Sequence, residues 1–331
     1  FPEDEFAKLR RQVLTSLAVS SAEPDYIAEH ELRQRMYGTH PYSRTATGEI
    51  GDVNALEVGD LKQWWSRFAR PDSAVVIFAG DIDEKKAYEL VEKTFGKWKA
   101  SEAKQDIKLP EIAEASGTHI YIVDKPGSTQ SQIRAGQMGI TRHDDGYFVS
   151  RLVSNYFGWS FNSRLNEVIR VQKGLTYGAW GGFTANRFAG DFTVGTFTKT
   201  ESTGEAVQTV IDEIRRLKSE APSEKELKES QTFMLGSFVR GRETPQQVAG
   251  DLWLIESQQL GSDYLERLLE AIAKATKTDC EKFVDKRVEP DRLVIVVVGE
   301  AEKIKEQLEK IAPVTVVPAE KPKEAKTAKA A

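Results

Sequence analysis

The feature that most constrains the fold of this chain is one sequence pattern that recurs after about 220 residues. Arg-Pro-Asp at 70–72 precedes the apolar run 74–79, and Glu-Pro-Asp at 289–291 precedes the apolar run 293–298. The prolines of these two motifs are 219 residues apart. Upstream landmarks are offset by 221 residues: Leu14, Ser16, Leu17 and Pro24 align with Leu235, Ser237, Phe238 and Pro245. Landmarks that hold register over this distance predict a duplicated structural unit.

The repeat divides the chain unequally. The second copy begins near residue 112, so we expect residues 1–100 to be the C-terminal half of a first domain whose front half precedes this sequence. Residues 112–316 form a complete second domain, joined to the first by the polar linker 101–111. The tail 317–331 has no apolar periodicity and is predicted to be disordered. A half-domain should also expose apolar surface.

Hydrophobic periodicity alternates between helical and strand spacing along both units. In the first unit we expect helices at 3–20, 24–37, 58–68 and 84–97 and a buried strand at 74–79. In the second unit we expect strands at 119–124, 129–138, 175–184, 191–198 and 293–298. Helices are expected at 147–157, 161–170, 203–218, from 223 onwards, and at 246–260, 262–274, 278–286 and 301–311.

Composition bounds the function. The 331 residues are 40% apolar and 29% charged, a soluble globular balance for more than one ordinary domain. The net charge of −5 argues against a nucleic-acid partner, and no apolar run is long enough for a membrane span. A single cysteine, Cys280, fits the cytosol or a disulfide-free periplasmic protein, with the periplasm slightly favoured. The chain opens without Met or a signal segment, like an internal start, so a missing signal says nothing about localisation.

The stretch 163–183 reads as a helix, a turn and a glycine-rich strand. Gly174 stands where a helix end needs a residue that can adopt positive φ. The strand 175–184 is thinned by glycines, which often mark the close approach of another backbone. One apolar helix face is predicted from four residues: Phe161, Leu165, Val168 and Ile169.

Arg170, on the last helical turn, and Tyr177, two residues into the strand, are predicted to converge. A guanidinium and a phenol beside an open backbone suit a peptide carbonyl or the charge that develops on it. Spacing alone favours a structural interpretation, in which Arg170 caps helix carbonyls and Tyr177 is a half-buried strand aromatic.

Metal chemistry is not expected in this chain. Zinc hydrolysis of this type needs two His four residues apart on one helix face, a third ligand and a carboxylate that takes a proton from water. No two of the four histidines have that spacing: His30, His40, His119 and His143. His30-Glu31 opens a pattern like H-E-x-x-H, but Gln34 stands in place of the second histidine.

The segment from Ser163-Arg164-Leu165 through Arg170 to Tyr177 resembles the second-domain signature of the insulinase/pitrilysin peptidases, which are inverted-motif zinc endopeptidases. The later half of the family's first domain is similar to Pro2-Glu3-Asp4 through Leu17, to His40-Pro41-Tyr42 with Gly48, and to the strand after Arg-Pro-Asp. The resemblance covers about residues 1–316. It implies an α+β fold of duplicated domains, each an open, mostly antiparallel sheet with helices on one face, the first copy truncated at its N-terminal half.

In that family two pairs of domains close around a peptide. One half carries zinc, and the other supplies an arginine–tyrosine pair near the scissile bond. Arg170 and Tyr177 match that pair, so the resemblance implies that they contact the substrate and its oxyanion. It also implies no cofactor in this chain and zinc in a partner subunit or in a preceding part of a longer chain.

The sequence departs from catalytic members at two positions. Ser16 aligns with their glutamate zinc ligand, and Leu9 with another position that is usually acidic. We therefore expect the non-catalytic, substrate-engaging half of a zinc metalloendopeptidase, working with a zinc-bearing subunit or domain, for example as a heterodimer. The alternative is a proteolytically inactive homologue that acts as an assembly or structural scaffold. The Arg170–Tyr177 pair favours the first, because a scaffold has no need of both.

Overall fold

The computed structural model describes residues 1–100 and 107–318. Its centre is one six-stranded sheet with the strand order β3-β4-β2-β5-β1-β6. The strands are β1 (His119–Asp124), β2 (Gln130–Met138), β3 (Ala179–Ala185), β4 (Gly190–Lys199), β5 (Val294–Gly299) and β6 (Val314–Pro318). The pairs β3–β4, β4–β2 and β2–β5 are antiparallel, whereas β5–β1 and β1–β6 are parallel. The expected α+β fold with a mostly antiparallel open sheet is confirmed.

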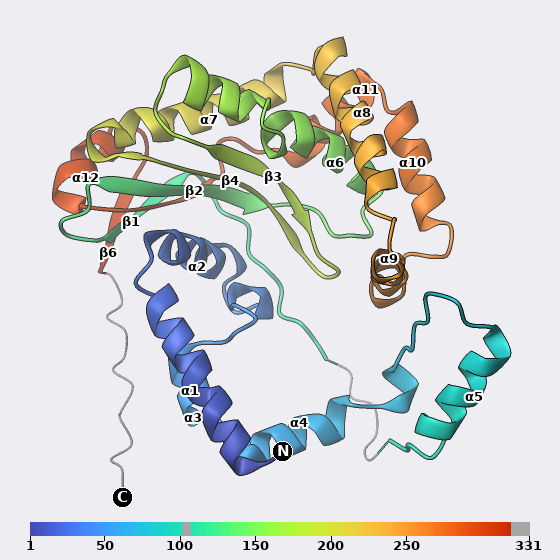
Figure 1. Ribbon diagram of the computed structural model, residues 1–331. Coiled ribbons are helices and arrows are strands. Elements are labelled where there is room, and N and C mark those ends of the chain that lie inside the picture. Colours follow the sequence, from blue (N-terminus) through green and yellow to red (C-terminus); the bar gives the residue numbers. More distant parts are fainter. Residues whose placement is uncertain (101–106, 319–331) are drawn as a thin grey trace, which may run out of the picture.

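The helices divide into three groups around this sheet (Figure 1). One face is covered by α6 (Tyr147–Ser154), η3 (Asn155–Trp159), η4 (Asn166–Gln172), α7 (Thr203–Ser219), α8 (Glu224–Arg240), α10 (Tyr264–Lys274), α11 (Lys277–Arg287) and α12 (Ala301–Glu309). The opposite face carries α2 (Pro24–Tyr37). The others are α1 (Glu3–Ser20), α3 (Ile50–Ala55), α4 (Val58–Phe68), α5 (Glu84–Phe95), α9 (Pro245–Gln258) and the short turns η1 (Pro41–Ser43), η2 (Pro71–Ser73) and η5 (Thr200–Ser202).

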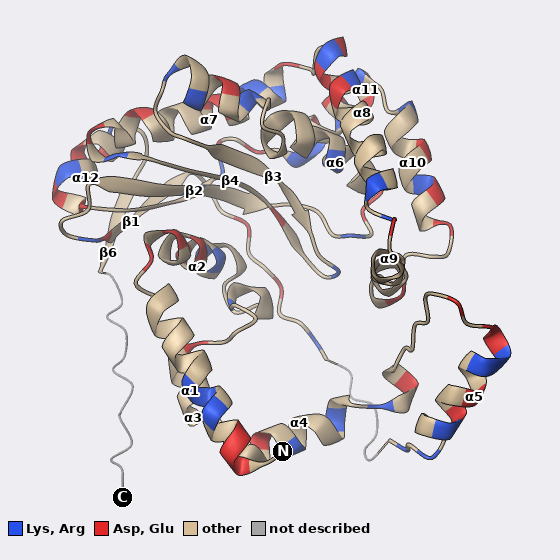
Figure 2. Ribbon diagram, viewed as in Figure 1, with Lys and Arg blue, Asp and Glu red and all other residues tan. Residues whose placement is uncertain are grey.

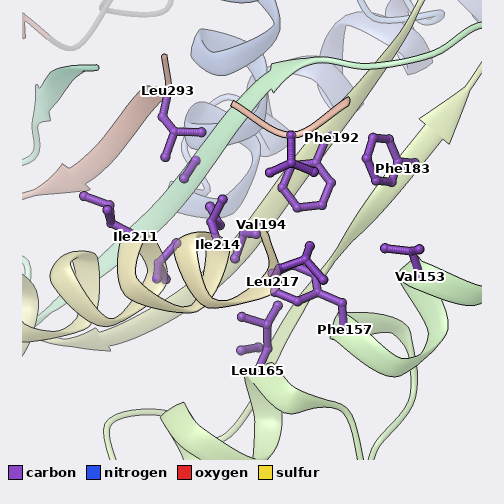
Figure 3. Close-up of a cluster of buried hydrophobic side chains, with 14 of the residues drawn as sticks. Val153, Phe157, Leu165, Phe183, Phe192, Val194, Ile211, Ile214, Leu217 and Leu293 are labelled. Atoms are coloured by element: carbon purple, nitrogen blue, oxygen red, sulfur yellow. The ribbon is translucent and has the colours of Figure 1, made fainter. Parts of the chain in front are cut away.

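The main core lies between the sheet and its helical layer (Figure 3). The rings of Phe183 and Phe192 on adjacent strands lie 4.7 Å apart, and Phe283 of α11 meets Phe183 edge-on at 5.0 Å. Leu165, Ile214 and other apolar side chains from the helices fill the same layer. Full burial of one such side chain contributes about 1.5–3 kcal/mol, so this layer fixes the second unit. Figure 2 shows that the charged residues gather on the helices, while the strands are mostly uncharged.

Helix α2 joins the first unit to the second by packing on the sheet's other face. Its apolar residues Ala28, Leu32 and Met36 form a second cluster with valines of β5. Tyr37 at its C-terminal end donates a hydrogen bond of 2.6 Å to the Asp191 carboxylate of β4. Burial raises the pKa of both groups. The two units therefore share a buried, polar-locked contact.

The apolar run 74–79, predicted as a buried strand, is not a strand. Val75, Val76 and Phe78 are 45%, 47% and 38% exposed. A strand needs neighbours that take up its backbone N–H and C=O groups, and no strand within the described residues pairs with this run. Its counterpart in the repeat, β5, is paired on both sides. The prediction was wrong because pairing depends on partners and not on the composition of the run.

The first unit exposes apolar surface, as expected of a half-domain. Helices α4 and α5 contain no buried residue. Their exposed large side chains include Trp64, Trp65, Phe68, Tyr88, Leu90 and Phe95.

The boundaries of the second unit differ slightly from the predicted ones. Residues 317 and 318, assigned to the tail, belong to β6. The rest of the predicted tail, 319–331, and most of the predicted linker, 101–106, lie outside the described residues. The helix α3 was not predicted. Whether the two units superpose stays a prediction.

Candidate functional site

The segment that carries Arg170 is anchored by a buried arginine. The side chain of Arg164 is 4% exposed, and its guanidinium donates to both carboxylate oxygens of Glu226, at 2.6 and 3.1 Å. It also donates to the backbone carbonyls of Glu220 and Ala221. Burial alone would raise the pKa of Glu226, but hydrogen bonds from Arg164 and Ser223 hold it at about 2. The start of this segment is thereby fixed to the N-terminus of α8.

The predicted apolar helix face is only partly present. Leu165 and Ile169 are fully buried and Val168 is nearly so, whereas Phe161 is 71% exposed. Phe161 lies in the turn before the helix, so it does not share the helical phase of the other three. Its ring instead lies under the guanidinium carbon of Arg170, 4.5 Å from the ring centroid.

The turn after η4 follows the prediction at Gly174, whose φ is +62°. Here the N–H groups of Lys173 and Leu175 donate to the carbonyls of Val168 and Ile169 and close the helix end. A left-handed residue at this position reverses the chain toward the sheet.

Tyr177 lies in the turn that precedes β3 and not two residues inside a strand. The Thr176 hydroxyl accepts from the Gly178 N–H and donates to its carbonyl, at 3.1 and 3.0 Å. The Ala179 N–H donates to the Asn166 side chain. Side chains thus satisfy backbone groups that a strand partner would otherwise take. The Tyr177 ring is consequently 84% exposed rather than half-buried.

Arg170 and Tyr177 line the same recess, which has a volume of about 480 Å³ and lies at the β3 edge of the sheet. Among the described residues, Arg170 has neither a carboxylate partner nor a hydrogen bond to a helix carbonyl. The capping role that spacing alone favoured is therefore not seen. Other residues that line this recess are Asp25, Gln132, Arg134, Trp159, Phe161, Asn166, Trp180, Thr196 and Phe197.

Three of these residues were missed by the sequence reasoning. Arg134 of β2 is buried, and its guanidinium forms an ion pair with Asp25 of α2. It also lies 5.2 Å from the ring centroid of Trp180. Asp25 and Arg134 are 109 residues apart in sequence, so no local pattern could have joined them. The Ala-Trp-Gly-Gly run gave a weak signal for Trp180, because glycines beside a large ring mark open space.

The described residues do not fit a zinc ion. They contain no group of three or more His, Cys, Asp or Glu side chains that could hold a metal. His30 is bonded to Glu49 at 2.9 Å, and buried His40 accepts the Tyr42 N–H. Both imidazoles therefore already have partners within the protein. Within the same part of the chain, every helix is too short or too polar to cross a bilayer.

Comparison with known proteins identifies the family. Residues 55–234, more than half of the chain, match the model described as "Peptidase M16 inactive domain". The chain belongs to this family. It is thus a non-catalytic half of the insulinase/pitrilysin type. The M16 inactive-domain match extends across the linker into α8 and includes both Arg170 and Tyr177.

Curated relatives support the M16 assignment. The chain is 24% identical over 244 residues to "Uncharacterized zinc protease YmxG" of Bacillus subtilis, a match that covers 74% of this chain and 58% of that protein. It is 22% identical over 307 residues to "Non-peptidase homolog YmxG" of Helicobacter pylori, covering 92% and 70%. The chain therefore spans little more than half the length of the first of these relatives.

Solved structures share the fold. A peptidase M16 inactive domain from Pseudomonas fluorescens has a TM-score of 0.80 at 24% identity, covering 90% of this chain and 71% of that one. A protease from Helicobacter pylori has a TM-score of 0.81 at 19% identity, covering 90% and 72%. A chain of complex III2 from Candida albicans has a TM-score of 0.74 at 13% identity, covering 92% and 74%. At these identities the likeness concerns the fold.

Proposed function

We propose that this chain is the substrate-engaging, non-catalytic half of a zinc-dependent metalloendopeptidase. The observation that carries the proposal is the placement of Arg170 and Tyr177 on one recess. Zinc is supplied by a partner subunit or by a preceding part of a longer chain, because the described residues offer no ligand set for it. We place this assembly in the periplasm in preference to the cytoplasm.

Arg170 anchors the peptide. Its guanidinium presents several N–H donors in a fixed plane, and no described carboxylate competes for them. Such a fork positions a peptide carbonyl in the ground state and in the transition state alike. The adjacent Phe161 ring holds the guanidinium at the mouth of the recess.

Tyr177 supplies a hydrogen bond where charge develops. Its phenol is free of packing obligations because the ring is 84% exposed. When a carbonyl carbon is attacked, its oxygen becomes an oxyanion, and the phenol donates to that oxygen. One donor of this kind contributes about 2.7–4 kcal/mol to transition-state stabilisation.

A test uses the chain together with a zinc-bearing M16 subunit from the same organism. Peptide hydrolysis by the mixture should exceed that of either protein alone, and Arg170→Ala should weaken binding of a fluorescent peptide to the mixture. Hydrolysis that the chain does not enhance, together with no peptide binding, overturns the proposal.

The alternative is a proteolytically inactive scaffold. It is favoured by the names of two similar proteins, the "Non-peptidase homolog" of Helicobacter pylori and the complex III2 of Candida albicans. A scaffold binds its partner, but neither Arg170→Ala nor Tyr177→Phe affects peptide cleavage. Measuring partner association and cleavage on the same samples separates the two functions.

A further inference from the structure

Trp180 lies across the sheet on the face that α2 partly covers. In the register of the sheet, Trp180 of β3, Gly195 of β4 and Arg134 of β2 form one row. A Cβ on Gly195 would lie 2.4 Å from two atoms of the Trp180 ring. The glycine therefore leaves the space in which the indole lies flat over the strand. This fixes the position of the ring before any ligand arrives.

The end of the row is closed by a buried cation. The side chain of Arg134 is 4% exposed and lies 5.2 Å from the Trp180 centroid. Its neighbours Ile133 and Ala135 belong to the core on the other face, so strand alternation directs Arg134 toward α2 and the recess. There it pairs with Asp25 and lies 3.7 Å from the Glu29 carboxylate.

The open surface of Trp180 is apolar and available. The residue is 42% exposed and lines the recess together with Phe161 and Phe197. A flat aromatic surface of this kind favours an aromatic or large apolar side chain, through area burial and ring stacking.

The charges around the recess oppose a basic side chain. Asp25 is the acidic residue among those that line it, and its carboxylate is taken by Arg134. Arg170 adds a positive charge without a carboxylate partner among the described residues. A lysine or arginine side chain would therefore meet two guanidinium groups and no free carboxylate, an arrangement that discriminates by repulsion.

We propose that Trp180 forms a side-chain subsite that selects a large apolar or aromatic residue of the bound peptide and excludes a basic one. This inference rests on the proposed function, because it assumes that Arg170 and Tyr177 hold the peptide backbone. Arg134 and Gly195 act as positioning residues for the Trp180 ring.

Binding of fluorescently labelled, acetylated and amidated peptides tests the subsite. Phe, Met, Lys or Ala is placed in turn at each central position of a short alanine-rich peptide, and affinity is read from fluorescence anisotropy. At one position Phe should bind about tenfold more tightly than Ala. Met and Lys have similar length, so weaker binding of Lys than of Met at that position isolates the effect of charge.

The variants identify the residue responsible. Trp180→Ala should abolish the preference for Phe over Ala, whereas Trp180→Phe should retain most of it. Trp253→Ala is the matched control, because Trp253 is 56% exposed on α9 outside the recess. Circular dichroism establishes that each variant is folded, and Trp180→Phe keeps the test open if Trp180→Ala does not fold.

The outcomes separate the two proposals. Peptides that bind with equal affinity whatever the side chain, and still respond to Arg170→Ala, overturn the subsite and leave the proposed function intact. A Phe preference that survives in Trp180→Ala also overturns it. If no peptide binds at all, both the subsite and substrate engagement by this chain fail.

Discussion

The guanidinium carbon of Arg170 lies 4.5 Å from the centroid of the Phe161 ring. A cation over an aromatic face gains about 0.5–1 kcal/mol at an exposed site. The contact also limits the rotamers of a long side chain, and so it reduces the entropy lost when a ligand binds. Arg170 is thus held at the mouth of the recess by a ring and not by a carboxylate, which leaves its N–H donors for a peptide.

Tyr177→Phe and Arg170→Ala should have different kinetic effects when the chain works with a zinc-bearing subunit. Tyr177→Phe removes one donor used in the transition state, so kcat and kcat/KM should fall together, by about 100-fold. Arg170→Ala removes an anchor used in the ground state as well, so it should chiefly raise KM. Steady-state kinetics of peptide cleavage measure both.

The control for this pair is Tyr88→Phe, since Tyr88 is 70% exposed on α5 and lies outside the recess. Tyr177→Phe should not change the melting temperature, because an exposed ring contributes little packing. A kcat within about twofold of wild type for Tyr177→Phe, under about 0.5 kcal/mol on the transition-state scale, removes the catalytic role from this residue.

The chain alone should bind no stoichiometric zinc. Among the described residues no cluster of ligands exists, and His30 is already bonded to Glu49. Metal analysis after chelation and reloading with zinc measures the content, and His30→Ala should leave it unchanged. One tightly held zinc per chain contradicts this prediction.

The sequence predicted most elements of the second unit because their signals are local and their partners are present. The apolar run 293–298 was predicted as a strand, and β5 (Val294–Gly299) is observed between β1 and β2. The run 74–79 has a similar composition but no strand partner among the described residues, and it remains exposed. Periodicity therefore reports what a segment can form, while pairing decides what it does form.

The site was predictable only along the chain. Arg170, Gly174 and Tyr177 lie within eight residues, so helix and turn geometry could bring the two side chains near one recess. Asp25 and Arg134 meet only because α2 packs on the sheet, and no spacing in the sequence announces that contact. Phe161 was misplaced for a related reason, since a turn interrupts the helical phase that the pattern assumed.

Glu226→Gln should destabilise the chain in a pH-dependent way. The folded pKa of Glu226 is about 2, below its usual 4.5. The ion pair with Arg164 therefore contributes stability above pH 4.5, and this contribution is lost as pH falls from 4.5 toward 2. The pKa difference corresponds to about 3 kcal/mol at most. Urea unfolding at a series of pH values should show a smaller acid-dependent loss in Glu226→Gln.

The matched control is Glu229→Gln on the same helix. Its side chain is 62% exposed and only loosely paired with Lys225, at 3.9 Å, so the change should be under about 0.5 kcal/mol. Equal acid sensitivity of Glu226→Gln and wild type would show that the buried pair does not stabilise the fold.

The contact between Tyr37 and Asp191 should control how the two units hold together. Tyr37→Phe removes the 2.6 Å hydrogen bond and leaves a buried carboxyl with weaker donors, at a cost of about 1–3 kcal/mol. Burial raises the folded pKa of Asp191 above its usual 3.8, so its contribution is largest below pH 3.8 and declines as pH rises through the folded pKa. The Tyr37 hydrogen bond opposes that rise, so in Tyr37→Phe the folded pKa is higher still, and the decline extends to higher pH.

Asp191→Asn should remove this pH dependence, because the amide does not titrate. Tyr26→Phe is the control, since Tyr26 lies on the same helix and its hydroxyl has no hydrogen bond to a described residue. Urea unfolding across a series of pH values compares the four proteins. If Tyr37→Phe unfolds at the same urea concentration as wild type at every pH, the apolar contacts of α2 with β5 hold the two units together without the polar pair.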